Sequence, residues 1–320
     1  MNKKKVFKTV DLFAGIGGIR LGFESTGGFK TVYANDFEPK CKITYDLNFK
    51  DAQLDVRDIR EVKSSDLPKD YDILLGGFPC QAFSIAGYRE GFDDKKGRGN
   101  LFFEIERILR ETKPKGFLLE NVKNLETHDQ GRTFKTIQKS LRKLGYHIKK
   151  EVLNSMDYGN VPQNRQRIYI VGFLDKQLTE RFEFPKPVKS TQTIKDILDL
   201  NVQEKYHYNG KSLYPRIAND IGREDTSYQW RRKYVRENKA NVFPTLTANM
   251  GEGGHNVPII KQGEIIRKIT PKECSRVQGF PDDFRLPETL ADSHLYKQFG
   301  NSVTVPVIRR IAEQMYKVLE

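Results

Sequence analysis

The chain has 320 residues, which is enough for one large domain or two unequal ones with a sizeable core. Lysine and arginine number 55 against 42 aspartate and glutamate, so the net charge of +13 favours a polyanionic partner such as nucleic acid, although many ordinary enzymes are also basic. The three cysteines and five histidines show no metal-ligand spacing, and no stretch has the length and apolarity of a membrane span. We therefore expect a soluble cytoplasmic protein with no bound metal, neither exported nor anchored in a membrane.

Short apolar runs alternate with helical patterns from residue 6 to about residue 173. This alternation predicts an α/β fold with a doubly wound, mostly parallel sheet of the Rossmann-like type. The expected strands span residues 6–13, 30–35, 52–56, 72–76, 116–120, 148–153 and 167–173. Two amphipathic helices are clearest, at residues 101–111 and 132–144.

The pattern changes after Phe173. A proline-rich stretch at residues 184–187 opens a region without strand–helix alternation, rich in Asn, Gly, Tyr and Arg, which predicts a second, smaller domain. The last part regains a helical pattern with an apolar stripe that should pack on the first domain. We expect a first domain at 1–184, a second at 185–266, and a return to the first at 267–320.

One segment has an unusual charge pattern. Residues 132–150 hold seven basic residues and no acid. Two interpretations remain open at this point: a solvated face on a basic protein, or a surface that faces phosphates.

A glycine-rich turn follows the first expected strand, in Asp11-Leu12-Phe13-Ala14-Gly15-Ile16-Gly17-Gly18. Such a turn lets a ligand approach the backbone closely, and Asp36 ends the next strand, where nucleotide-binding sheets hold a ribose by its hydroxyls. Phe37 is placed to stack on an adenine or to pack in the core, and Asp55 ends the third strand, where it can accept from the adenine amine. The alternative is a plain strand–helix connection, but Asp36 favours an adenosine-containing cofactor.

Cys80 lies in the loop Gly76-Gly77-Phe78-Pro79-Cys80-Gln81, directly after a buried strand. A structural cysteine normally lies inside an apolar element, whereas this thiol is presented where α/β folds place their chemistry. Glu120 ends a further strand, and Arg165 precedes the last one. A thiol, a carboxyl and a guanidinium at one sheet edge form a constellation for adding a nucleophile to an electron-poor ring.

These motifs, in this order, resemble those of the DNA (cytosine-5)-methyltransferases of bacterial restriction-modification systems. Two later stretches complete the resemblance, at residues 267–281 and at Gln298-Phe299-Gly300-Asn301-Ser302-Val303. The resemblance implies a cofactor-binding and catalytic domain, a smaller target-recognition domain, and S-adenosyl-L-methionine as the methyl donor. It assigns the cofactor contacts to Phe13, Ala14, Gly15, Gly17, Asp36, Phe37, Asp55, Pro79, Leu101, Asn301 and Ser302.

The mechanism implied by the resemblance agrees with the residue chemistry. The Cys80 thiolate adds to carbon-6 of a cytosine rotated out of the duplex, which activates carbon-5 for methylation. Glu120 engages ring nitrogen 3 and the amino group, and Arg165 orients the ring through its oxygen. Gln81 and Arg167 complete the candidate catalytic set, with a purely structural ion pair as the alternative for Arg167.

Specific double-stranded DNA is the partner that the resemblance implies. Ser84 and Arg89 are candidates for backbone contacts, and Thr245 for a phosphate near the flipped base. Arg231 and Arg232 are candidates for reading guanine, with plain phosphate contacts as the alternative. We expect a monomer that acts independently of any cognate endonuclease, with Cys41 and Cys274 as packed thiols.

Two other classes remain open. The first is methylation of RNA by a related branch, and the second is a DNA-binding protein that has lost catalysis. The chain lacks the Asp/Asn-Pro-Pro-aromatic motif that methylation of exocyclic amino groups requires.

Overall fold

The computed structural model describes residues 5–79, 101–238, 240–252 and 256–320. The chain divides into two compact units. The first comprises Met1–Leu153, Gln166–Pro185 and Ile311–Glu320, and the second comprises Asn154–Arg165 and Lys186–Arg310. None of the described helices is long and apolar enough to cross a membrane.

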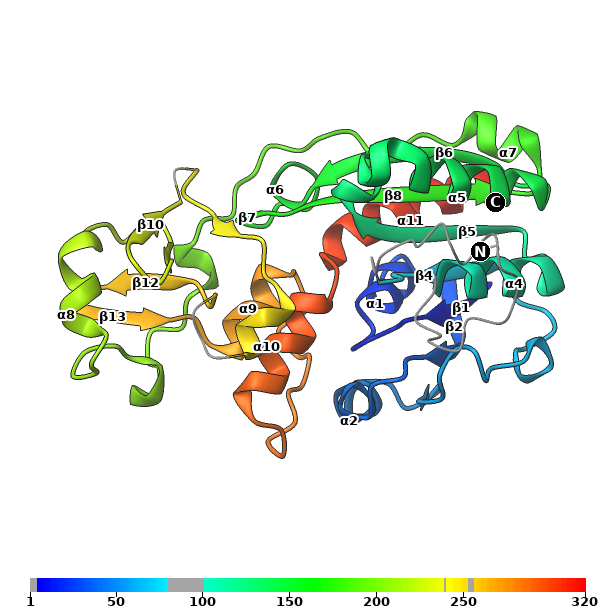
Figure 1. The fold of residues 1–320 in the computed structure, drawn as a ribbon. Helices are drawn as coiled ribbons and strands as arrows, with labels where there is room; N and C mark the ends of the chain where they lie inside the picture. The colour runs from blue at the N-terminus through cyan, green and yellow to red at the C-terminus, as the bar shows by residue number, and fades with distance from the viewer. Residues whose placement is uncertain (1–4, 80–100, 239, 253–255) are drawn as a thin grey trace. The chain divides into compact units, whose positions relative to one another are not determined.

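The first unit is built on a seven-stranded sheet in the order β3-β2-β1-β4-β5-β8-β6 (Figure 1). Its strands are β1 (Phe7–Leu12), β2 (Phe29–Asn35), β3 (Leu54–Asp55), β4 (Ile73–Gly76), β5 (Gly116–Val122), β6 (His147–Asn154) and β8 (Gln166–Phe173). The strands from β3 to β5 are parallel, whereas β8 runs antiparallel to β5. The predicted doubly wound, mostly parallel sheet is confirmed, and each predicted strand is present.

Helices cover both faces of this sheet. The helices of the first unit are α1 (Gly18–Glu24), α2 (Pro39–Asn48), α4 (Leu101–Thr112), α5 (Arg132–Lys143), α7 (Lys176–Arg181) and the end of α11 (Val305–Leu319). Apolar residues of α4 and α5 join one core with Val10, Leu74 and Leu119 of the strands. On the other face, Phe29 packs against Phe23 of α1 and Tyr316 of α11, with ring centroids 4.8 and 5.9 Å apart.

The register of the sheet brings the ends of its parallel strands to one edge. Leu12 lies opposite both Asn35 and Gly76, and Asn35 lies opposite Asp55. Because all five parallel strands point the same way, the residues that follow them share this carboxyl-terminal edge. We call it the rim.

The second unit contains a four-stranded sheet in the order β10-β9-β12-β13 and a short parallel pair of β7 with β11. Its strands are β7 (Gln163–Asn164), β9 (Tyr228–Trp230), β10 (Val235–Glu237), β11 (Phe243–Pro244), β12 (Ile259–Gln262) and β13 (Ile265–Lys268). Its helices are α6 (Ser155–Tyr158), α8 (Tyr214–Ile217), α9 (Pro271–Val277), α10 (Asp292–Asn301) and the start of α11. A small core around Tyr228, Ile259 and Ile266 supports the sheet.

The division of the chain differs in part from the expected boundaries. The first unit's middle segment ends at Pro185, next to the expected boundary at 184, but residues 154–165 and 267–310 cluster with the second unit. Within residues 154–165, strand β7 pairs with β11 of the second unit, in agreement with the first difference. Cys41 in α2 and Cys274 in α9 are buried free thiols, so the expectation of packed cysteines is confirmed.

The contact between β5 and β8 depends on a missing side chain at Gly116. A Cβ atom there would lie 2.6 Å from the carbonyl oxygen of Gly172, which belongs to the facing strand and cannot move aside. We expect Gly116→Ala to lower the free energy of unfolding by about 1–3 kcal/mol through overpacking. Gly222→Ala, where a Cβ would meet no atom within 4 Å, is the control and should change stability by less than about 0.5 kcal/mol. Urea unfolding of both variants measures the difference, and equal midpoints would contradict the expectation.

Candidate active site

The glycine loop after β1 is built from left-handed backbone. Phe13, Gly15 and Gly17 have φ angles of 56°, 54° and 85°. A side chain at Gly17 would lie 2.3 Å from the Phe49 ring, so that glycine is required by packing, whereas a Cβ at Gly15 would meet no atom within 4 Å. Ala14 is buried, and its amide donates to the Asn35 carbonyl over 3.0 Å. The loop is therefore anchored to the end of β2 and leaves open space next to Gly15.

Asp36, at the end of β2, is joined to this loop directly. One carboxylate oxygen accepts from the amide of Gly15 and the other from the amide of Glu38, both over 2.9 Å. Burial raises the pKa of Asp36 above its ordinary value, and the two amide hydrogen bonds oppose that rise. Phe37 is 66% exposed, so its ring lies outside the core and is available for stacking. Each Asp36 oxygen keeps acceptor capacity for a ribose hydroxyl.

Asp55, at the end of β3, has protein partners for its carboxylate. It accepts from the Tyr33 hydroxyl over 2.7 Å and from the Arg57 guanidinium over 2.6 Å. The hydrogen bonds from Arg57 lower the pKa of Asp55 to about 2. The second acid of this stretch, Asp58, is held by Arg60 in the same way. Asp55 is thus an ionised acceptor whose orientation is set before any ligand binds.

Glu120 lies at the end of β5, where its carboxylate meets a guanidinium. The oxygen Oε1 of Glu120 lies 3.1 Å from Nε of Arg167, on the antiparallel neighbour β8. Glu120 is only 8% exposed, so solvent screens this pair weakly. A side chain at Gly77 would lie 3.6 Å from Oε2 of Glu120, so the carboxylate also borders the segment that leads to Cys80.

Asn121 anchors that segment and was not among the expected site residues. Its side-chain amide donates to the Phe78 carbonyl over 2.9 Å, in a buried position. The bond fixes the backbone two residues before Cys80, and the position of Asn121 directly after Glu120 was the sequence signal for it. Pro79 is exposed, and Leu101 is partly buried at the start of α4. The expected site residues Cys80, Gln81, Ser84 and Arg89 lie outside the described residues.

Arg165 belongs to the second unit, and Arg167 is the guanidinium that the structure places beside Glu120. Arg165 is 2% exposed and donates to three backbone carbonyls, those of Leu246, Gly300 and Ser302, over 2.7, 3.3 and 2.5 Å. Both terminal nitrogens of its guanidinium therefore have backbone partners within the second unit. This arrangement ties three segments together that are far apart in the sequence.

A buried polar network surrounds Arg165. Gln163 donates to the Val277 carbonyl and accepts from the Leu246 amide, over 3.1 and 3.0 Å. Gln278 donates to the Phe299 carbonyl over 2.8 Å, and Thr304 donates to Gln278. These bonds connect four segments that are far apart in the sequence, at Gln163, at Leu246, at residues 277–278 and at residues 299–304. They hold the end of α10, where Asn301 is exposed and the C-cap residue Ser302 is partly buried.

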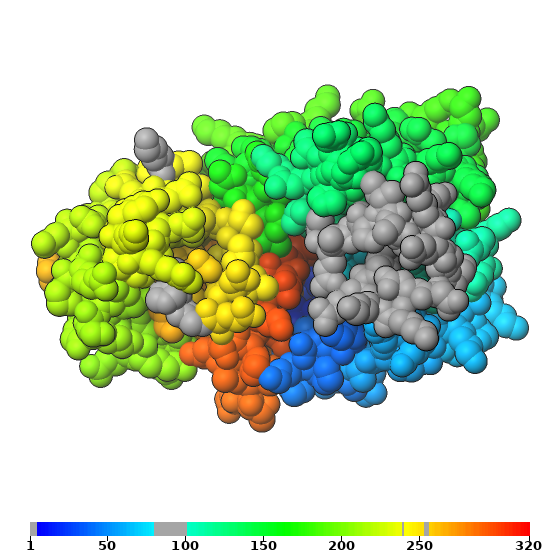
Figure 2. Space-filling model, in the orientation of Figure 1, coloured from blue at the N-terminus to red at the C-terminus, as the bar shows by residue number. Residues whose placement is uncertain are grey.

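The candidate DNA contacts of the second unit fall into two groups. The hydroxyl of Thr245 donates to the Asn164 carbonyl over 2.7 Å, so its oxygen remains an acceptor. Arg231 and Arg232 are exposed on the turn between β9 and β10, where Arg232 has a left-handed φ of 66°. The amide of Arg231 donates to the Tyr234 carbonyl over 2.9 Å and closes the hairpin. The segment around β10 lies on the face of the second unit that is visible in Figure 2.

The model of one protein family matches residues 7–317, and its description is C-5 cytosine-specific DNA methylase. The chain belongs to this family. Its fold and activity are those of a DNA (cytosine-5)-methyltransferase, and S-adenosylmethionine is the methyl donor.

Relatives match this methyltransferase over nearly its full length. The type II methyltransferase M.Bsp6I of a Bacillus species (strain RFL6) is 55% identical over 316 residues, 98% of this chain and 99% of the relative. M.NlaX of Neisseria lactamica is 43% identical over 318 residues, 98% and 97% of the two chains. Among solved structures, the DNMT2 mutant of Spodoptera frugiperda superposes with a TM-score of 0.77 at 22% identity, covering 97% of this chain and 99% of that one. At this identity the superposition shows the fold.

The rim of the methyltransferase fits the methyl donor on its own geometry. Gly15 leaves a space that the side chain of a larger residue would fill. The Asp36 carboxylate accepts from the Gly15 amide and so lies next to this space. The ring of the following residue, Phe37, is exposed. These three residues would hold the amino-acid, ribose and adenine parts of the donor, and Asp55 would accept from the adenine amine.

Asp11 is a further buried acid next to the glycine loop. It is fully buried in β1, and neither of its carboxylate oxygens has a hydrogen-bond partner among the described residues. Burial raises the pKa of Asp11 to about 7, and the nearby Arg20 offsets only part of that rise. Asp11 was not among the expected site residues, because its position inside the first expected strand gave no sign of a functional role.

Loss of the Asp36 carboxylate should weaken binding of S-adenosylmethionine. We expect Asp36→Ala to raise the dissociation constant about 10- to 100-fold, since it removes acceptors that are already oriented by the loop. Titration calorimetry of the whole chain measures this. Asp58→Ala is the control, because the Asp58 carboxylate is held by Arg60. The affinity of this variant for S-adenosylmethionine should stay within twofold of the wild-type value. An unchanged affinity in Asp36→Ala would remove Asp36 from the donor site.

Asp11 should make the protein less stable as the pH rises from about 4 to 7. Its pKa is raised in the folded state, so the unfolded chain loses the proton first and gains the free energy of ionisation. Relative to that of Asp11→Asn, the free energy of unfolding of the wild-type chain should fall by up to about 4 kcal/mol across this pH window and change little at higher pH. Denaturant unfolding of both proteins at several pH values gives the difference. A constant difference across the window would contradict the raised pKa.

Proposed function

We propose that the chain is the modification enzyme of a restriction-modification system, methylating carbon-5 of one cytosine within a short duplex DNA sequence. The observation that carries this proposal is the buried pair of Glu120 and Arg167 beside the segment that Asn121 anchors before Cys80. The 55% identity to a type II methyltransferase over nearly the full chain supports the biological role. The enzyme would act as a monomer in a bacterial cytoplasm, independently of an endonuclease.

The chemical steps follow from the residues. Carbon-5 of cytosine is a poor nucleophile while the ring is aromatic. Addition of the Cys80 thiolate to carbon-6 gives an enamine whose carbon-5 can form a bond to an electrophile. S-adenosylmethionine would supply that electrophile, a methyl group on a sulfonium, and the methyl–sulfur bond would break with its electron pair left on the neutral thioether S-adenosylhomocysteine. A base then removes the carbon-5 proton, and the thiolate leaves as the double bond re-forms.

Glu120 and Arg167 stabilise the charge that this addition creates. The Glu120 carboxyl hydrogen-bonds ring nitrogen 3 and the amino group, where negative charge develops during attack. Its pairing with Arg167 orients the carboxyl. The Arg167 guanidinium would then donate to the ring's oxygen. For Arg165, the three bonds to carbonyls support a positioning role, in which it shapes the second unit around Leu246 and Ser302.

The second unit would recognise the DNA. The target base must leave the stack at a cost of a few kcal/mol before Cys80 can reach it. Exposed Arg231 and Arg232 on the β9–β10 turn suit base-edge or phosphate contacts, and the Thr245 oxygen can accept from a water that bridges to a phosphate. Ser84 and Arg89 would add backbone contacts close to the flipped base.

Transfer of labelled methyl from S-adenosylmethionine tests the function. Wild-type protein should label duplex DNA, and bisulfite sequencing should locate 5-methylcytosine in one short motif. Cys80→Ser should abolish transfer because the weaker hydroxyl nucleophile cannot replace the thiolate, and Glu120→Gln should slow it by about 10²-fold or more. Cys41→Ser changes a packed thiol in α2 and should retain transfer.

The outcomes separate the remaining classes. Label on tRNA and none on DNA would assign the chain to an RNA-methylating branch. Label on neither substrate, with wild-type folding, would indicate a binding protein without catalysis. Methylation scattered over many unrelated sequences would contradict the role in restriction-modification.

A further inference from the structure

Helix α5 carries a charge pattern that its packing does not explain. One face of the helix is buried through Thr133, Phe134, Ile137 and Leu141. The remaining surface carries five exposed cations in twelve residues and no acid. They are Arg132, Lys135, Lys139, Arg142 and Lys143. The green and teal part of the first unit, which includes α5, lies at the surface in Figure 2.

The neighbouring helix α4 shows how an ordinary solvated face is balanced. Its Arg107 pairs with Glu104 and Glu111 at 2.8 and 3.5 Å, and Arg110 pairs with Glu106 at 3.9 Å. On α5 only Arg132 pairs with an acid, Asp129. Within the described parts of the chain, no ion pair involves Lys135, Lys139, Arg142 or Lys143. The face of α5 is therefore uncompensated, in contrast to that of α4.

The spacing of these cations opposes the helix itself. Lys135 and Lys139 are four residues apart, as are Lys139 and Lys143, so each pair places like charges side by side. Arg142 and Lys143 lie in the last turn, where cations interact favourably with the helix dipole. Lys135 and Lys139 lie in the middle of the helix and gain no such benefit. A bound polyanion would remove the repulsion that they create.

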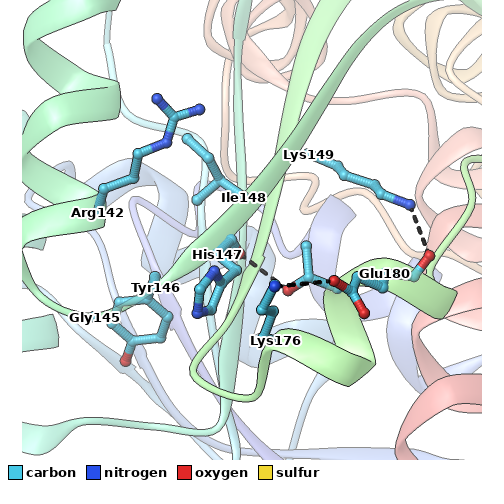
Figure 3. Close-up of a pocket in the computed structure, with 9 residues that line it drawn as sticks. Arg142, Gly145, Tyr146, His147, Ile148, Lys149, Lys176 and Glu180 are labelled. Atoms are coloured by element: carbon cyan, nitrogen blue, oxygen red, sulfur yellow. Dashed lines mark hydrogen bonds and ion pairs between the residues drawn. The ribbon is translucent and has the colours of Figure 1, made fainter.

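Of the four unpaired cations, only Arg142 borders the pocket at the end of α5. This cavity of about 440 Å³ is bordered by Arg142, His147, Lys149, Lys176 and Glu180 (Figure 3). Lys149 donates to the carbonyls of Glu180 and Phe182, and Lys176 pairs with Glu180 at 3.4 Å. Its lysines thus have partners in the protein. The unpaired cations lie along α5.

We propose that Lys135, Lys139, Arg142 and Lys143 form a secondary, sequence-independent contact for the phosphate backbone of DNA that flanks the methylated site. Lys135 and Lys143 are about 12 Å apart along the helix, which matches three to four phosphates of one DNA strand. A membrane surface does not fit, because the apolar residues of α5 are already buried in the core. Such a contact would hold the enzyme on DNA between target sites.

The inference rests on the proposed function, since DNA is the substrate, but it concerns residues outside the catalytic set. Binding is measured by fluorescence anisotropy with a 30-base-pair duplex of A·T pairs only, which offers no cytosine, at several salt concentrations. For Lys135→Gln with Lys139→Gln, we expect weaker binding and a salt slope shallower by about 1.8, as expected for two lost phosphate contacts.

A matched variant removes the same charge elsewhere on the first unit. Lys69→Gln with Lys113→Gln neutralises two exposed lysines outside α5 and should leave the slope at the wild-type value. An unchanged slope for the α5 variant, or an equal change in the control, would overturn the proposal. The proposal would also be overturned if the wild-type protein bound duplex RNA of equal length more tightly than the DNA and the α5 variant lost that preference.

Methyl transfer to a short duplex containing the target site is measured in parallel. The α5 variant should keep the wild-type kcat on this substrate. Normal transfer together with an unchanged salt slope overturns the α5 contact alone, whereas absence of transfer by the wild-type protein overturns the proposed function.

Discussion

The parallel alignment of β3, β2, β1, β4 and β5 is the constraint on which the site of the first unit depends. Because these strands share one direction and register, the ends of the strands and the residues that follow them meet at the rim. Open backbone comes from Gly15, acceptors come from Asp36 and Asp55, and the carboxyl comes from Glu120. The antiparallel strand β8 then begins where β5 ends, and so brings Arg167 to Glu120.

Hydrogen bonds to backbone atoms hold the loops of both units in place. In the first unit, Asp36 bonds the Gly15 amide and Asn121 bonds the Phe78 carbonyl. In the second unit, Gln163 and Arg165 bond backbone groups of segments that are remote in sequence. Buried bonds of this kind are costly to leave half made, so each network favours one arrangement of its loops. The polar residues of the motifs are therefore structural supports as well as chemical groups.

Several charged groups at the sheet were unexpected from their sequence context. Asp11 lies in an apolar strand motif, yet it is a buried acid without a hydrogen-bond partner among the described residues, and Arg20 nearby is only 1% exposed. Arg20 bonds Glu24 and the Tyr45 hydroxyl, so its charge is balanced within the core under the glycine loop. The helices α4 and α5 differ in a similar way. Both are amphipathic, but both arginines of α4 pair with acids, whereas on α5 only Arg132 has an acidic partner.

The sequence by itself determined the strands of the first unit along the chain, the two clearest amphipathic helices and the family. These properties depend on local periodicity and on motifs, which are written along the chain. Tertiary structure alone decided which arginine faces Glu120, because Arg165 and Arg167 are two residues apart and only the packing of the folded chain separates them. It also decided that Asn121 anchors the Cys80 segment, that residues 154–165 cluster with the second unit, and that Phe37 is exposed. Each of these results depends on contacts between distant segments, for which a single sequence contains no local signal.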